Sequence, residues 1–134
     1  MSEQDNTSLV QQAYENFKTG NIQALLSLCS GDIEWQLPEI ENVPFAGTRR
    51  SREQVGQFFA SVGAEQEVLE FEPKEFIAHG DKVVALGHYA WRVKSTGRRF
   101  DGDWAHVFTV SEGRIVRFQE YTDTATAAAA YRKP

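Results

Sequence analysis

The main change in the hydrophobic period of this chain limits the folds open to it. Apart from one short alternating segment and a loop, apolar residues up to Gly63 recur about every 3.6 residues, as in an α-helix, and after Gly63 they alternate with polar ones, as in a β-strand. Helices followed by strands are typical of an α+β protein whose helices gather on one face of a sheet. A chain of 134 residues suits one domain with a sizeable core, so we expect a single domain spanning residues 1–134.

Three helices are predicted before that change. The first has its apolar residues on one face, namely Leu9, Val10, Ala13, Tyr14 and Phe17. Thr7 or Ser8 is its expected N-cap, and Asn21 is the expected N-cap of a second helix. Ser51 begins a third helix, which Gly63 ends. The alternating segment "DIEWQL" predicts a short strand between the second and third helices, followed by a loop, "PEIENVPFAGT".

Four strands are predicted after the change, and three glycine-containing turns separate them. The strands are expected at about residues 68–78, 82–93, 100–110 and 115–121, and the turns are "HGDK", "STGR" and "SEGR". Short turns favour antiparallel pairing of each strand with the next. The tail, about residues 123–134, fits either a final helical turn or a loose segment.

The "SEGR" turn decides which side chains of the last two strands share a face. A two-residue hairpin loop needs a positive φ at Glu112, which a residue with a side chain resists. We therefore expect a type I turn over Ser111 and Glu112, with Gly113 in the left-handed region. That turn pairs Val110 with Arg114, and a slip of one residue would move every side chain to the other face.

This register places a carboxylate among aromatic residues. The inward face of the last two strands then holds Trp104, His106, Phe108, Val116, Phe118 and Glu120. On the preceding strand, the more apolar parity holds Val83, Ala85, Gly87, Tyr89, Trp91 and Val93. His106 lies opposite Phe118 in this register, so His106 and Glu120 become diagonal neighbours whose side chains can converge. Trp35 and Phe59 are expected to supply further walls of the hollow.

An inward glutamate has a functional and a structural interpretation. A buried carboxylate is costly unless it is paired, hydrogen-bonded or protonated, and such a group suits general acid or base catalysis. In that case His106 would orient Glu120, share its proton or act as the partner acid. In the alternative, Glu120 faces solvent or an arginine and His106 only caps a buried carbonyl.

Charge and composition argue against several other classes of protein. The formal net charge of −5 disfavours nucleic acid and anionic membrane surfaces as partners. No apolar run approaches the roughly 20 residues that span a bilayer. The N-terminus "MSEQDNTS" is unlike a signal peptide, so a cytoplasmic location is expected.

The sequence gives no support for a metal, a cofactor or a reactive thiol. The three histidines, His79, His88 and His106, lack the spacing of metal ligands, and no nucleotide-binding loop is present. We therefore expect neither a metal nor a cofactor. The single cysteine, Cys29, lies in the apolar run "IQALLSLC" and is expected to be a buried, inert thiol.

Two segments carry a resemblance to a known family. "GNIQALLSLCSGDIEWQLP" and "DWAHVFTVSEGRIVRFQEYTDT" resemble the SnoaL-like group of the nuclear-transport-factor-2-like superfamily, and the resemblance covers nearly the whole chain. It implies a cone-shaped, strongly curved mixed β-sheet wrapped around three N-terminal helices, a cystatin-like α+β barrel in which the short first strand joins the sheet. It also implies a homodimer formed through the outer face of that sheet.

The resemblance also implies roles for particular positions. In the cyclase and epoxide-hydrolase branches a catalytic aspartate lies on the last strand, where this chain has Glu120, and a residue that assists it falls on His106. The isomerase branch instead uses a base and a tyrosine at the places of Leu37 and Ala13, so steroid isomerisation is disfavoured. The epoxide-hydrolase branch also needs an arginine and an aspartate on a strand that here carries Gly87, Tyr89 and Trp91.

Two functions follow as hypotheses. The first is an enzyme of cyclase, isomerase or lyase type, in which Glu120 and His106 catalyse proton transfer on a small hydrophobic or aromatic substrate. The residues expected to contact that substrate are Tyr14, Trp35, Phe59, Tyr89, Trp91, Trp104 and Phe118. The second is a non-catalytic module of the same fold that binds a small ligand or serves dimerisation.

Overall fold

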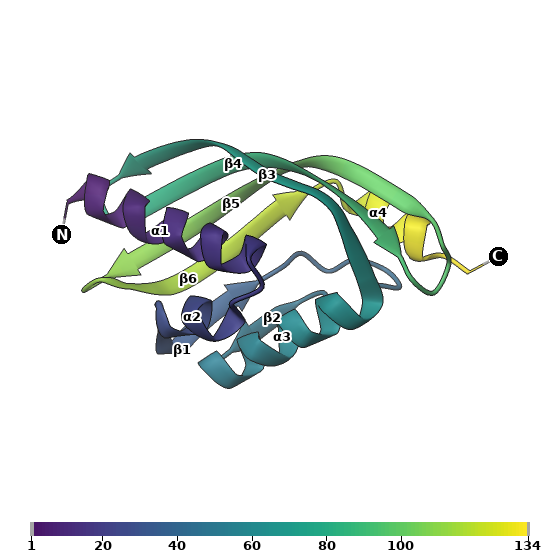
Figure 1. Cartoon of the computed structure of the whole chain (residues 1–134), viewed down its shortest axis with the longest axis horizontal. Coiled ribbons are helices and arrows are strands. Elements are labelled where there is room, and N and C mark those ends of the chain that lie inside the picture. Colours follow the sequence, from purple (N-terminus) through teal and green to yellow (C-terminus); the bar gives the residue numbers. More distant parts are fainter. Residues whose placement is uncertain (1, 134) are drawn as a thin grey trace.

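Six strands form one curved, open sheet in the order β2-β1-β6-β5-β4-β3 (Figure 1). The computed structural model describes residues 2–133. Its helices are α1 (Glu3–Lys18), α2 (Ile22–Ser27), α3 (Arg52–Glu65) and α4 (Thr124–Tyr131). Its strands are β1 (Cys29–Gln36), β2 (Thr48–Arg50), β3 (Gln66–His79), β4 (Lys82–Val93), β5 (Arg99–Ser111) and β6 (Arg114–Thr122). The expected α+β class and the curved sheet with its three N-terminal helices are confirmed.

The sheet is mixed, as the resemblance implied. Strands β3 to β6 form the antiparallel meander that their short turns predicted. β1 pairs parallel with β6, and the short β2, where no strand was predicted, pairs antiparallel with β1 at one edge. α1 packs against β3 and β4, α3 against β1 and β2, and α4 against β5 (Figure 1). These helices and the concave face of the sheet enclose the core.

Side-chain caps fix the starts of the helices. Asn21 caps α2 and Ser51 caps α3, as predicted, and each side-chain oxygen accepts a hydrogen bond from the main-chain N–H three residues later. The prediction for α1 is wrong, because Ser2 is its N-cap rather than Thr7 or Ser8. The polar, acidic first turn of α1 carries no apolar period, which is why the start of the helix was placed too late.

The β5–β6 turn differs from its prediction. Glu112 and Gly113 form a two-residue loop in which both have positive φ, 52° and 77°. Ser111 therefore pairs with Arg114, one residue away from the expected register. A register shift follows at once, because β6 accommodates Val116 as an extra residue in a β-bulge.

The turn and the bulge together restore the predicted faces of the strand. Each moves the pairing by one residue in the same direction, so the pairing is shifted by two residues from Phe118 onwards. His106 therefore lies directly opposite Glu120 rather than diagonal to it. Only the position next to the bulge was assigned to the wrong face, since Ile115 is fully buried and Val116 is only half-buried.

The remaining inward rows agree with the prediction. The six residues of β4 that were expected inward are all buried: Val83, Ala85, Gly87, Tyr89, Trp91 and Val93. The tail, which the composition left open, forms α4 and buries Ala127 and Tyr131 against the core. No helix within residues 2–133 combines the length and apolarity needed to cross a bilayer.

Candidate active site

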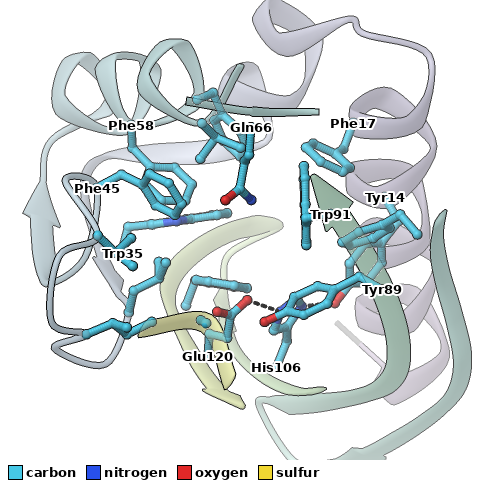
Figure 2. Close-up of a pocket in the computed structure, with 18 of the residues that line it drawn as sticks. Tyr14, Phe17, Trp35, Phe45, Phe58, Gln66, Tyr89, Trp91, His106 and Glu120 are labelled. Carbon is cyan, nitrogen blue, oxygen red and sulfur yellow. Dashed lines mark hydrogen bonds and ion pairs between the residues drawn. The ribbon is translucent and has the colours of Figure 1, made fainter. Parts of the chain in front are cut away.

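A cavity of about 100 Å³ lies between the concave face of the sheet and the helices (Figure 2). Its walls come from all four helices, β1, the loop after β1 and the strands β3 to β6. Eight of the nine residues predicted for the site line it: Tyr14, Trp35, Phe59, Tyr89, Trp91, His106, Phe118 and Glu120. Trp104 is the exception, since it is buried behind His106 instead of lining the cavity.

Three polar residues form a hydrogen-bonded chain at one wall of the cavity (Figure 2). His106 Nε2 lies 2.9 Å from Glu120 Oε2, and His106 Nδ1 lies 2.7 Å from the hydroxyl oxygen of Tyr14. The side chains of His106 and Glu120 are only 5% and 13% exposed. Within residues 2–133 the second carboxylate oxygen, Oε1, has no hydrogen-bond partner, so it is free to contact a molecule in the cavity.

The Tyr14 hydroxyl determines which nitrogen of His106 carries the proton. Burial, and then the negative charge of Glu120, hold the pKa of Tyr14 well above its usual range. Tyr14 therefore stays protonated and donates to Nδ1. With Nδ1 accepting this hydrogen bond, the ring proton of His106 lies on Nε2 and is donated to Oε2 of Glu120.

Close packing holds the His106 ring in place. The Trp104 ring stacks on it with centroids 3.9 Å apart and planes 14° apart, and Phe118 meets it edge-on at 4.7 Å. Gly87 makes room for this stack, because a Cβ there would overlap the Trp104 ring and the main-chain oxygen of Glu72. Trp104 thus supports the catalytic candidate from behind.

Tyr89 adds a second protonated hydroxyl beside the carboxylate. Burial is the main cause that raises its pKa, and the charge of Glu120 adds to it. Its oxygen lies 2.8 Å from Oγ1 of Thr122, which itself donates to the main-chain oxygen of Asp103. Because the proton of Thr122 is used there, Tyr89 is the donor to Thr122.

Gln66 is a lining residue that the sequence reasoning missed. It is the first residue of β3, its exposed fraction is only 5%, and Figure 2 shows its amide pointing into the cavity. The predicted strand began two residues later, which left Gln66 outside any predicted element. Gln66 pairs with Val93, which belongs to the inward row of β4. Extending the predicted strand back by two residues would therefore have placed Gln66 on the inward face.

The outer face of the sheet carries a separate polar cluster. His88 Nδ1 lies 2.9 Å from Asp103 and its Nε2 lies 3.5 Å from Asp101. The hydrogen bond to Asp103 is the main cause that raises the pKa of His88. Across residues 2–133, no set of three or more His, Cys, Asp or Glu side chains is arranged to hold a metal ion.

Known proteins share this architecture over most of the chain. A family model described as the SnoaL-like domain matches residues 10–118. The chain is similar to a nuclear-transport-factor-2-like protein from Burkholderia xenovorans, with 33% identity, 98% of this chain and 99% of that chain covered, and a TM-score of 0.90. It is also similar to TerC, co-crystallised with polyporic acid, with 26% identity, coverage of 96% and 99%, and a TM-score of 0.83.

A third solved structure shows the fold alone. A protein from Mesorhizobium loti, named as a candidate SnoaL-like polyketide cyclase, has 20% identity over 86% of this chain and 97% of that chain, with a TM-score of 0.73. No curated protein matches the chain.

Proposed function

The chain belongs to the SnoaL-like family of the nuclear-transport-factor-2-like superfamily, and we propose that it is an acid–base enzyme acting on a small hydrophobic substrate. One observation carries this proposal. The hydrogen-bonded series from Tyr14 through His106 ends at the Glu120 carboxylate in an aromatic cavity, and Oε1 of that carboxylate has no hydrogen-bond partner among residues 2–133. A carboxylate held in this way suits proton abstraction from carbon, because its reacting oxygen needs no reorientation.

The proposed reaction begins with a proton on a carbon beside a carbonyl group. Glu120 Oε1 removes it, so the C–H bond breaks, an O–H bond forms, and the electron pair moves onto the carbonyl oxygen as an enolate. In isomerisation the substrate also has a C=C bond next to the reacting carbon, so the product of proton removal is a dienolate, which takes the proton back at the far end of that bond as the double bond shifts. In cyclisation the enolate carbon attacks a second carbonyl of the same molecule, and Glu120 returns the proton to the new alkoxide.

His106 and Tyr14 act as positioning residues in this scheme. The Nε2–H of His106 holds Oε2 of Glu120 throughout and leaves Oε1 to exchange the proton. The Tyr14 hydroxyl keeps His106 in the tautomer that can do so. The aromatic walls exclude water, which would otherwise quench the enolate by protonating it.

Two of the similar solved structures support a small organic ligand. TerC was co-crystallised with polyporic acid, and the protein from Mesorhizobium loti is named as a candidate polyketide cyclase. The two positions that the isomerase branch uses for catalysis are occupied here by Leu37 and Ala13, which line the cavity but cannot transfer a proton. Cyclisation, or isomerisation through Glu120 alone, is therefore the chemistry that we propose.

Exchange of carbon-bound protons tests the proposal without knowledge of the natural substrate. α-Tetralone has two rings and an acidic CH₂ group beside its carbonyl, and its exchange with D₂O can be followed by NMR. We expect the wild-type protein to accelerate this exchange and Glu120→Gln to lose the acceleration. Glu75→Gln, which alters an exposed carboxylate of β3, serves as the control. Binding of α-tetralone without any exchange would instead identify a non-catalytic binding module.

A further inference from the structure

Gln66 presents a hydrogen-bond donor to the cavity that the proposed mechanism leaves unused. Its Oε1 accepts the hydroxyl proton of Tyr131 over 2.6 Å, which fixes the orientation of the amide. Within the described chain its Nε2 has no hydrogen-bond partner, and it is not among the unpaired polar atoms sealed inside the protein. Figure 2 shows the amide directed into the hollow, on the wall opposite Glu120.

The charges around the cavity indicate which group of a ligand can accept a hydrogen bond from this donor. Of the described residues that line it, none is a lysine or arginine, and Glu120 is the only carboxylate. A carboxylate or phosphate on a ligand would find no cation there and would be repelled by Glu120. An unpaired amide donor in an apolar wall instead favours a neutral acceptor such as a carbonyl oxygen.

We propose that Gln66 determines substrate specificity by donating a hydrogen bond from Nε2 to an uncharged carbonyl oxygen of a ring-containing substrate. Tyr131 is its positioning residue, because it holds Oε1 and so turns Nε2 toward the ligand. The substrate class is then a neutral aromatic or polycyclic ketone, rather than a hydrocarbon or an organic acid. This inference rests on the proposed function only in taking the cavity as the substrate site.

Two ligands of matched shape test the hydrogen bond. α-Tetralone and tetralin share the same two rings, but tetralin lacks the carbonyl oxygen, and quenching of Trp35 and Trp91 fluorescence reports the binding of either. We expect Gln66→Leu to weaken α-tetralone binding about fivefold to tenfold, the effect of one hydrogen bond, and to leave tetralin binding unchanged or tighter. An equal effect on both ligands, or no effect on either, overturns the proposal.

Two further variants separate recognition from folding. Gln66→Glu keeps an oxygen for Tyr131 but offers no amide donor, so we expect it to lose α-tetralone binding. Circular dichroism verifies that this variant is folded, because a buried carboxylate lowers the free energy of unfolding. Tyr131→Phe keeps the amide but frees its rotation, so we expect a smaller loss. If Gln66→Glu binds α-tetralone as tightly as the wild type does, the assigned role is wrong.

The test also distinguishes this inference from the proposed function. Glu120→Gln is expected to stop proton exchange yet keep its preference for α-tetralone, because that preference depends on Gln66. Naphthoate, a ring-matched carboxylate, is expected to bind more weakly than α-tetralone to the wild type. Equal or tighter binding of naphthoate contradicts the assigned substrate class, whatever the outcome of the exchange assay.

Discussion

At the scale of single residues, the site depends on hydroxyl groups that stay protonated next to a carboxylate. Burial, strengthened by the charge of Glu120, raises the pKa of both Tyr14 and Tyr89, so neither ionises near neutral pH. Tyr14 uses its proton to hold His106, and Tyr89 donates to Thr122. Changes that keep the rings but remove these hydroxyls therefore test positioning separately from packing.

Removal of the Tyr14 hydroxyl should disturb His106 without opening the cavity. Tyr14→Phe leaves Nδ1 without its donor, so we expect the exchange rate to fall about tenfold to a hundredfold and the free energy of unfolding to fall by about 1–3 kcal/mol. Nothing then keeps the ring proton on Nε2, where it holds Glu120. An unaltered exchange rate would indicate that Tyr14 only fills space.

Cys29 should resist thiol reagents in the folded protein. Burial raises the pKa of its thiol to about 11, although Arg52 opposes this shift. The thiolate fraction at pH 8 is then on the order of one in a thousand, and the labelling rate should rise as the pH increases toward the pKa. Labelling with a disulfide reagent in native buffer and in urea measures this. Rapid native labelling at pH 8 would contradict it.

At the scale of secondary-structure elements, the stack of Trp104 on His106 requires close contact between β4 and β5. Gly87 lies opposite Trp104 in that pairing and leaves the space that the indole ring occupies. We expect Gly87→Ala to cost about 1–3 kcal/mol in the free energy of unfolding, because neither the ring nor the main-chain oxygen of Glu72 can move freely.

A second glycine provides the control for that experiment. A Cβ at Gly63, within α3, would meet no other atom within 4 Å, so Gly63→Ala is expected to be neutral or slightly stabilising. Urea unfolding of both variants gives the comparison. If Gly87→Ala is as stable as Gly63→Ala, then the Trp104 stack is not as tight as described.

Most of the inward rows follow from the alternation of apolar and polar residues, whereas the turn and the bulge do not. Alternation identified the row of β4 and the face shared by His106 and Glu120, because only one parity buries the aromatic residues. It could not reveal the positive φ of Glu112 or the bulge at Val116, since local sequence preference opposes the first and tertiary pairing with β5 imposes the second.

The site was predictable to a similar extent. Glu120 and His106 could be found because both lie in regular strands. Gln66 and the role of Tyr131 could not, because they depend on where a helix turns into a strand and on how a tail of mostly small residues packs. Trp104 was assigned to the cavity because it shares a face with His106, but the packing of the two rings places it behind.

At the scale of the whole molecule, the outer face of the sheet carries an apolar surface. Half-buried apolar residues run across β4 and β5, and exposed ones flank them: Val84, Leu86, Ala105, Val107, Ile77 and Tyr121. We propose that two copies pair through this face, as is expected of the family, because a self-complementary apolar patch suits a two-fold dimer.

Light scattering after size-exclusion chromatography tests the dimer. We expect a mass of two chains for the wild type and a shift toward one chain for Val107→Glu, which places a charge in the middle of this face. Gln23→Glu adds the same charge at an exposed position of α2 and should leave the mass unchanged. A wild type that is monomeric at every concentration would exclude this arrangement.

The most direct test of the account is the rate of deuterium exchange into α-tetralone with the wild type and with Glu120→Gln, both verified as folded. The account predicts that the wild type is faster than the variant by about a hundredfold or more, since general acid–base catalysis contributes on that order. Equal rates in the two proteins would show that the carboxylate in the cavity does not transfer the proton.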